Sequence, residues 1–333
     1  MFRLNKNIKI FTNYFLGPAL FIWLSASIYQ QIKSQPHLET TWMNIRSSMQ
    51  GKQSWMLWAV IALMFINWGI EARKWQVLLK PLEKISWLTA YKATFAGLAF
   101  AVNTPNRIGE YGGRIIYISE SNRLKAVSLT VVGSMSQLLV TLLAGCGGLV
   151  YLLNLSQSIR ASMFTGSVLF WIQVTLYIIT FLLFVGLIIY FRLGWMIKII
   201  DRVPAFSRLV PYINVLEGLT PNHLFRILSL SCTRYLVFVG QYILMILLMQ
   251  VQVSVWQAFW LVTVIYLVLA IVPTIALAEI GLRGKISLEL FGLVSVNNIG
   301  IVAATIGIWS VNLIIPALIG SLFVLRIKIF KNQ

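Results

Sequence analysis

Arg107, Glu110 and Arg114 are the residues whose types and spacing give the clearest prospect of chemistry. They lie in a stretch containing Pro and Gly that separates two apolar segments, each long enough to span a bilayer. Thr104 is the expected N-cap, and Pro105 the first residue, of a helix that would begin inside the membrane. The free N–H groups at the start of such a helix favour a phosphate or carboxylate, and Arg107 would add a guanidinium donor. This first broken element therefore predicts an anion site, with phosphate as the natural ligand.

The spacing of the three charges predicts how they interact. Glu110 lies three residues after Arg107 and four before Arg114, so on one helix they would share a face and neutralise one another. Gly109 would let a neighbouring backbone or a headgroup approach closely. The alternative is an ordinary charged loop whose ions pair in water.

A second broken element in the other half of the chain has a similar pattern. Both elements read Pro, spacer, Glu-x-Gly-x-Arg, and the second comprises Pro273, Glu279, Gly281 and Arg283. The two copies lie 168 to 169 positions apart. Because the second has no early arginine like Arg107, we expect a weaker anion site there and a role mainly as a gate. Chance is the alternative, since Gly, Glu and Arg commonly occupy breaks between spans.

The repeated pattern predicts an internal repeat within a single membrane domain, 1–333. Residues 1–165 would form the first half and residues 166–333 the second, inverted half. Inverted repeats with broken helices at their interface are a recurrent plan in transporters.

Four further polar residues lie within apolar segments: Lys92, Gln137, Arg234 and Gln241. Of these, Gln137 is the candidate to line the same cavity as the broken elements. A lone arginine near mid-span costs roughly 3 kcal/mol or more and usually faces a partner or a cavity. The alternatives are snorkelling of Arg234 and Lys92 to the membrane surface and simple hydrogen bonding between helices.

Composition sets the fold class that must position these residues. Of the 333 residues, 59% are apolar and 11% charged, and the mean hydropathy is +0.82, which indicates a polytopic membrane protein. Strands without a closed barrel cannot span lipid, so we predict an all-α bundle with about six full spans and two broken or re-entrant elements. The clearest apolar runs are Tyr14–Gln30, Trp55–Gly69, Trp87–Val102, Val127–Leu153, Val168–Tyr190, Ile227–Met249, Phe259–Val272 and Ile301–Leu325.

The net charge of +18 points to anionic lipid headgroups and not to nucleic acid, because the basic residues are spread over loops between spans. If the regions around Trp87–Tyr117 and Phe259–Leu290 return to the side they entered from, 19 of the 27 Lys and Arg face one side, with Lys74, Arg107 and Arg114 among them. The positive-inside rule makes that side cytoplasmic, together with both termini, in the cell membrane. A mixed case, in which one region crosses fully, remains open.

The first apolar run could also be a cleaved signal peptide, since small residues follow it. We expect it to be retained as a helix, because its removal would unbalance this topology. Cys146 and Cys232 are single cysteines in apolar runs, and they indicate neither a metal site nor a disulfide framework. We expect no cofactor.

With these residues in view, the chain resembles the lysylphosphatidylglycerol synthase transmembrane region, also called the flippase-like family. The resemblance rests on Asn103-x-Pro105-x-Arg107-x-Gly109-Glu110 with Arg114, and on Pro273 with Glu279-Ile280-Gly281-Leu282-Arg283. It extends from about Met56 to Leu325. It implies an integral membrane protein with a paired broken-helix core that handles lipids. In the best-understood relatives the module moves an aminoacylated phospholipid between leaflets and is fused to a soluble aminoacyl-transferase domain.

Only eight residues follow the last span, so we expect a stand-alone module without that synthase domain. The first hypothesis is therefore a non-enzymatic lipid translocase for an anionic or aminoacylated phospholipid or a lipid-linked substrate. No Gly-x-x-x-x-Gly-Lys-Ser/Thr motif is present, so a gradient or lipid consumption would drive it.

Two hypotheses from other classes compete with the translocase. An intramembrane transferase could use Glu110 or Glu279 as a general base, although no His lies near either break. A membrane scaffold could instead support a separately encoded lipid-modifying enzyme. In all three cases anionic phospholipids are the expected partners, and the apolar surface is compatible with a monomer or an oligomer.

Overall fold

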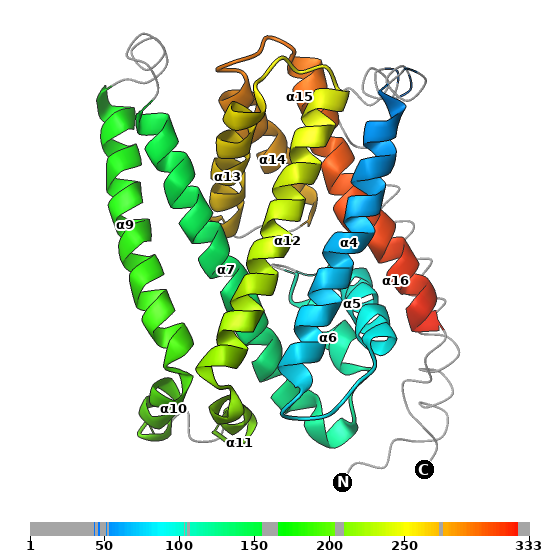
Figure 1. Ribbon diagram of the computed structural model, residues 1–333, viewed down its shortest axis with the longest axis vertical. Coiled ribbons are helices and arrows are strands. Elements are labelled where there is room, and N and C mark those ends of the chain that lie inside the picture. Colours follow the sequence, from blue (N-terminus) through cyan, green and yellow to red (C-terminus); the bar gives the residue numbers. More distant parts are fainter. Residues whose placement is uncertain are drawn as a thin grey trace.

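Helices that match the predicted apolar runs make up the bundle (Figure 1). The computed structural model describes residues 43, 46, 51, 53–102, 104, 107–154, 166–203, 210–272 and 276–325. In these residues, five helical segments are long and apolar enough to cross a membrane, which confirms the all-α bundle. They are α4 (Ser54–Leu79), α7 (Arg123–Leu153), α9 (Gly166–Phe191), α12 (Pro221–Leu248) and the continuous run of α15 (Asn298–Trp309), the π-helical turn η5 (Ser310–Ile314) and α16 (Ile315–Leu325). The first apolar run, Tyr14–Gln30, lies outside the described residues.

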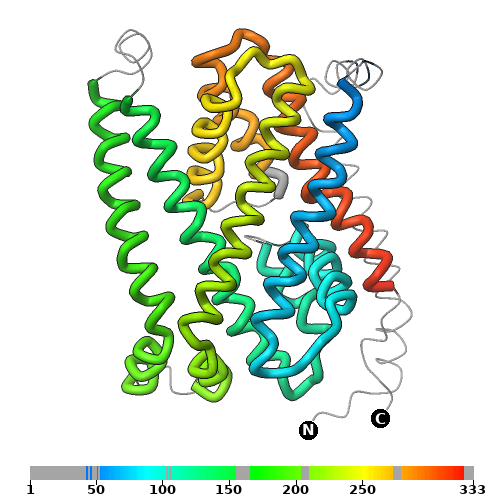
Figure 2. Tube along the Cα trace, in the orientation of Figure 1, coloured from blue at the N-terminus to red at the C-terminus, as the bar shows by residue number. Residues whose placement is uncertain are grey.

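Both predicted broken elements form helical hairpins that return to the end of the bundle from which they enter. The first hairpin consists of α5 (Trp87–Ala101) and α6 (Gly109–Ile115), and the second of α13 (Val255–Ile271) and α14 (Ala276–Phe291). At 15 and 17 residues, α5 and α13 fall short of the roughly 20 residues that a bilayer requires. Figure 2 shows the two hairpins entering from opposite ends of the bundle and approaching each other near its middle.

Local sequence explains where the hairpins and spans begin. Ser86 caps α5 by accepting a hydrogen bond from the Thr89 N–H, and Ser254 forms a capping box with Gln257 at the start of α13. Thr220 caps α12, with Pro221 in the first turn. These caps satisfy free backbone N–H groups at the ends where the chain re-enters the bundle.

Each hairpin packs against a span from the opposite half of the chain. Helix α5 lies along α16, whereas α13 lies along α7, and α4 and α12 run side by side between them. An inverted repeat would produce this packing of each hairpin against a span of the other half. The repeat itself stays a prediction. Its proposed boundary at residue 165 lies outside the described residues.

Short connecting helices lie at the lower end of the bundle in Figure 1: η2 (Glu120–Asn122), α10 (Leu193–Asp201), α11 (Val210–Ile213) and η4 (Asn214–Gly218). Exposed basic residues gather at the same end. They lie in the α4–α5 loop, on α10 and at the start of α12, as Lys80, Lys84, Lys198 and Arg226. The positive-inside rule predicts that this end is cytoplasmic.

Candidate functional site

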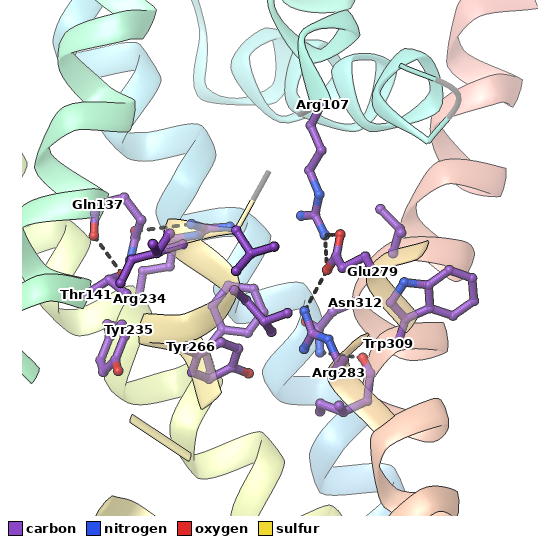
Figure 3. A pocket seen from close by; sticks show the side chains of 17 residues that line it. Arg107, Gln137, Thr141, Arg234, Tyr235, Tyr266, Glu279, Arg283, Trp309 and Asn312 are labelled. Carbon is purple, nitrogen blue, oxygen red and sulfur yellow. Dashed lines mark hydrogen bonds and ion pairs between the residues drawn. The ribbon is translucent and has the colours of Figure 1, made fainter. Parts of the chain in front are cut away.

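A cavity of about 520 Å³ lies where the two hairpins approach each other (Figure 3). Its wall is formed by residues of both hairpins and of α7, α12, α15 and η5. Charged and polar side chains in the wall are Arg107, Gln137, Thr141, Arg234, Tyr235, Tyr266, Glu279, Arg283, Trp309 and Asn312. The cavity therefore combines guanidinium groups from three separate parts of the chain.

Arg107 reaches from the tip of the first hairpin to the second. Its Nη2 donates to both carboxylate oxygens of Glu279, at 3.0 and 3.1 Å, and Figure 3 shows the side chain extended between the two elements. The Arg107 backbone has φ 57°, in the left-handed region, which costs a non-glycine residue roughly 1–2 kcal/mol. This conformation turns the chain before α6 begins.

Glu279 is shared between the two hairpins. Arg283, one turn further along α14, donates from Nη2 to Glu279 Oε1 at 2.7 Å. The Arg283 guanidinium also lies 5.7 Å from the centroid of the Tyr266 ring. One carboxylate thus serves two guanidinium groups, both of which face the cavity.

A second charged cluster lies behind the cavity wall and is centred on Glu71 of α4. Glu71 is 2.8 Å from Lys74 Nζ, 2.9 Å from Arg114 Nη2 and 3.4 Å from Arg234 Nε. Arg114 also contacts Glu110, one turn earlier on α6. Glu71 therefore connects a span, the first hairpin and α12 at one level of the bundle.

Arg234 links this second cluster to the cavity. Its Nη1 donates to Gln137 Oε1 at 3.1 Å, and its guanidinium lies 5.0 Å from the Trp68 ring and 4.9 Å from the Phe238 ring. The structure thus brings together Arg234, Gln137, Arg107, Glu279 and Arg283 around one cavity. Their functional roles stay predictions.

Several expectations for the first element are wrong. Thr104 is not an N-cap followed directly by a helix: α6 begins at Gly109, whose N–H donates to Thr104 Oγ1 at 2.8 Å. Arg107 precedes α6 in a left-handed conformation, so it does not share a helical face with Glu110 and Arg114. The Gly109 N–H at the start of α6 is therefore already occupied by Thr104, and the Arg107 guanidinium extends away to Glu279.

The remaining predicted site residues that the structure describes do not belong to the cavity wall, and some of them serve helix packing instead. A Cβ at Gly109 would lie 2.3 Å from Phe100 O, so the expected close approach is present there, whereas a Cβ at Gly281 would meet nothing within 4 Å. Gln241 is buried and donates to Val60 O of α4, and Lys92 is half-buried on α5; neither belongs to the cavity wall. Pro105 and Pro273 lie outside the described residues.

Glu71 and Lys74 are the main site residues that the sequence reasoning missed. We assigned Lys74 to a cytoplasmic loop, but α4 continues to Leu79 and Lys74 is 1% exposed. Arg114 was assigned to the same loop set and is 2% exposed. The available signal was an acid within an otherwise apolar span, which by itself indicates a functional or paired position.

Several residues of the cavity wall carry buried polar atoms without hydrogen-bond partners in the part of the chain that the structure describes. The Tyr235 hydroxyl, Trp309 Nε1 and Asn312 Oδ1 have no hydrogen-bond partner among the described residues. Asn312 lies in η5, and π-helical turns occur frequently at functional sites. Within the described part of the chain, no group of three His, Cys, Asp or Glu is placed to hold a metal ion.

Comparison with known families shows which family the chain matches. The model described as "Lysylphosphatidylglycerol synthase TM region" matches residues 14–320, which include both hairpins and every residue of the two charged clusters. No curated protein matches the chain.

Proposed function

The chain belongs to the lysylphosphatidylglycerol synthase transmembrane family, and on that premise we propose that it is a lipid translocase whose cavity holds a lipid phosphate. The family supports a membrane function connected with lipids. The finer assignment rests on one observation, the Arg107–Glu279 ion pair between two hairpins that enter from opposite ends.

A lipid phosphate would compete with Glu279 for the two guanidinium groups that donate to the Glu279 carboxylate. Arg107 and Arg283 both donate to Glu279, and phosphate oxygens accept the same charge-assisted hydrogen bonds. Binding of the phosphate would loosen the contact between the two hairpins. Because each hairpin is open to a different end of the bundle, their separation provides access from one leaflet or the other.

Apolar residues beside the charged groups suit the acyl chains of a lipid. Leu269, Ile271 and Val272, near the tip of the second hairpin, line the cavity together with the arginines. Ile271 and Val272 are exposed large hydrophobic residues. A ligand with an anionic head and apolar chains would therefore match both parts of the wall.

Transport by purified protein in liposomes tests this proposal. We would compare the wild type with Arg107→Ala and Arg234→Gln in vesicles of native lipid extract, and follow leaflet sidedness and lipid mass by impermeant headgroup labelling and mass spectrometry. Loss of one charge-assisted hydrogen bond is expected to slow lipid movement about tenfold or more in each variant.

Arg226→Gln is the matched control, because Arg226 lies on α12 like Arg234 but is exposed and outside the cavity wall. It should transport at the wild-type rate. A lipid that changes mass would identify an intramembrane transferase instead. Unchanged transport in both cavity variants would contradict the site, and the absence of any lipid movement would favour a scaffold.

A further inference from the structure

Cations outnumber carboxylates in the cluster centred on Glu279, at the cavity wall. Arg107 and Arg283 share the single carboxylate of Glu279, so two cations face one anion. Both oxygens of that carboxylate are engaged, since Arg107 contacts Oε1 and Oε2 and Arg283 contacts Oε1. One positive charge in this cluster is therefore uncompensated.

The cluster centred on Glu71 has the same excess. Three cations surround two carboxylates there: Lys74, Arg114 and Arg234 against Glu71 and Glu110. Of these five side chains, Arg234 lines the cavity. The two clusters thus direct an excess of two positive charges toward one space.

No other acid in the described part of the chain compensates this excess. Eight of the nine acids of the sequence are described, and the ninth, Glu39, lies outside those residues. The acids outside the two clusters do not belong to the cavity wall; they are Glu83, Glu120, Asp201, Glu217 and Glu289. Excess charge in an apolar interior is costly unless a ligand neutralises it.

We propose that the cavity is selective for lipids with a dianionic phosphate headgroup, a phosphomonoester or a diphosphate. A phosphomonoester carries about −1.5 to −2 charges near neutral pH, which matches the excess of two, whereas a phosphodiester headgroup carries one. Three guanidinium groups can donate the charge-assisted hydrogen bonds that phosphate oxygens accept. This inference rests on the proposed function and names the substrate class of the same site.

The same geometry disfavours aminoacylated and other ammonium-bearing headgroups. The one carboxylate in the described cavity wall, that of Glu279, is already held by two arginines. An ammonium group would therefore find no free anion and would face three guanidinium groups. Of the anionic and aminoacylated phospholipids considered from the sequence, the anionic class fits this cavity.

Binding by the full-length protein tests the headgroup directly. We would use native mass spectrometry in maltoside detergent with phosphatidate, phosphatidylglycerol and lysylphosphatidylglycerol of identical acyl chains, and inorganic diphosphate as a soluble competitor. Phosphatidate should bind at least about tenfold more tightly than phosphatidylglycerol, and lysylphosphatidylglycerol should bind most weakly.

Gln137→Glu is the informative variant. Gln137 accepts from Arg234 Nη1, so a near-isosteric carboxylate would pair with that guanidinium and lower the excess charge from two to one. The preference for phosphatidate over phosphatidylglycerol should shrink about tenfold, while the thermal unfolding temperature is retained or raised. Gln252→Glu, on the exposed α12–α13 loop, adds the same charge outside the cavity and should change nothing.

The outcomes distinguish failure of the headgroup inference from failure of the translocase proposal. Equal affinity for phosphatidate and phosphatidylglycerol, or tightest binding of lysylphosphatidylglycerol, overturns the inference even if lipids are transported. Competition by diphosphate at concentrations that match the lipid would identify a site for free phosphate and overturn its assignment to lipid. If phosphatidate binds preferentially but no lipid changes leaflet in vesicles, the headgroup assignment stands and the translocase proposal fails.

Discussion

Glu71 of α4 is the carboxylate that the buried cations around it depend on. It contacts cations of α4, α6 and α12, and two of them, Lys74 and Arg114, are nearly inaccessible. Buried ion pairs rarely add net stability, yet removal of one partner leaves the others without compensation. The carboxylate therefore fixes the relative positions of three elements more than it strengthens the bundle.

Replacement of this carboxylate should be strongly destabilising. Glu71→Gln leaves three cations around a neutral amide, so we expect a loss of about 3–5 kcal/mol, measured as a lower unfolding temperature of the detergent-purified protein. Glu217→Gln, at an exposed position in η4, is the control and should have little effect. Adding Lys74→Met to Glu71→Gln should recover part of the loss by removing one orphaned charge. An unfolding temperature equal to that of the wild type would refute this role.

At the scale of elements, the first hairpin is held by close backbone contacts. A Cβ at Gly113 would lie 2.6 Å from Ala96 O, and one at Gly320 of α16 would lie 1.9 Å from Phe95 O. Small residues allow helices to approach in membranes, where no hydrophobic force drives them together. These contacts set how far α5 and α6 reach into the bundle, and hence where Arg107 lies.

Neighbouring glycines of α6 offer a matched test of this packing. Gly113→Ala forces a methyl group against the backbone of α5, so we expect a destabilisation of about 1–3 kcal/mol and a loss of lipid binding. Gly112→Ala meets nothing within 4 Å and should be neutral or slightly stabilising, because alanine favours helix. Similar effects of the two substitutions on unfolding temperature would show that the close contact is unimportant.

At the scale of the whole molecule, the two hairpins decide how many times the chain crosses the membrane. Because α5 and α6 return to the end they came from, the residues before and after the first hairpin should lie on one side. In a background without Cys146 and Cys232, we expect Lys84→Cys and Glu120→Cys to react with an impermeant maleimide from the same side, the cytoplasmic one. Labelling from opposite sides would show a full crossing.

The loops that flank the second hairpin are expected on the opposite side of the membrane from those that flank the first. Gln252 and Val296 flank it in exposed loops, and Val296 is 98% exposed. Cysteines at these two positions should react from one side, opposite to that of Lys84→Cys. This result would place the hairpins on opposite sides of the membrane, as alternating access requires.

The sequence by itself determined the helical bundle, the two breaks and the presence of ionisable groups at membrane depth. These features are local, because apolar runs of bilayer length, caps such as Ser254 and charges within a span are read from neighbouring residues. Arg107, Arg234, Glu279 and Arg283 were identified on that basis, and they share the cavity. The local spacing rule failed where Arg107 adopts a left-handed conformation before α6.

Only the tertiary structure decided which charge pairs with which. Arg107 and Glu279 are 172 positions apart, and the α6 residue Arg114 contacts Glu71 of α4, 43 positions earlier. No local spacing predicts these pairs, because they depend on how deeply each hairpin enters and which span it meets. The excess positive charge at the cavity is likewise a property of the assembled bundle, since it is counted over side chains that only packing brings together.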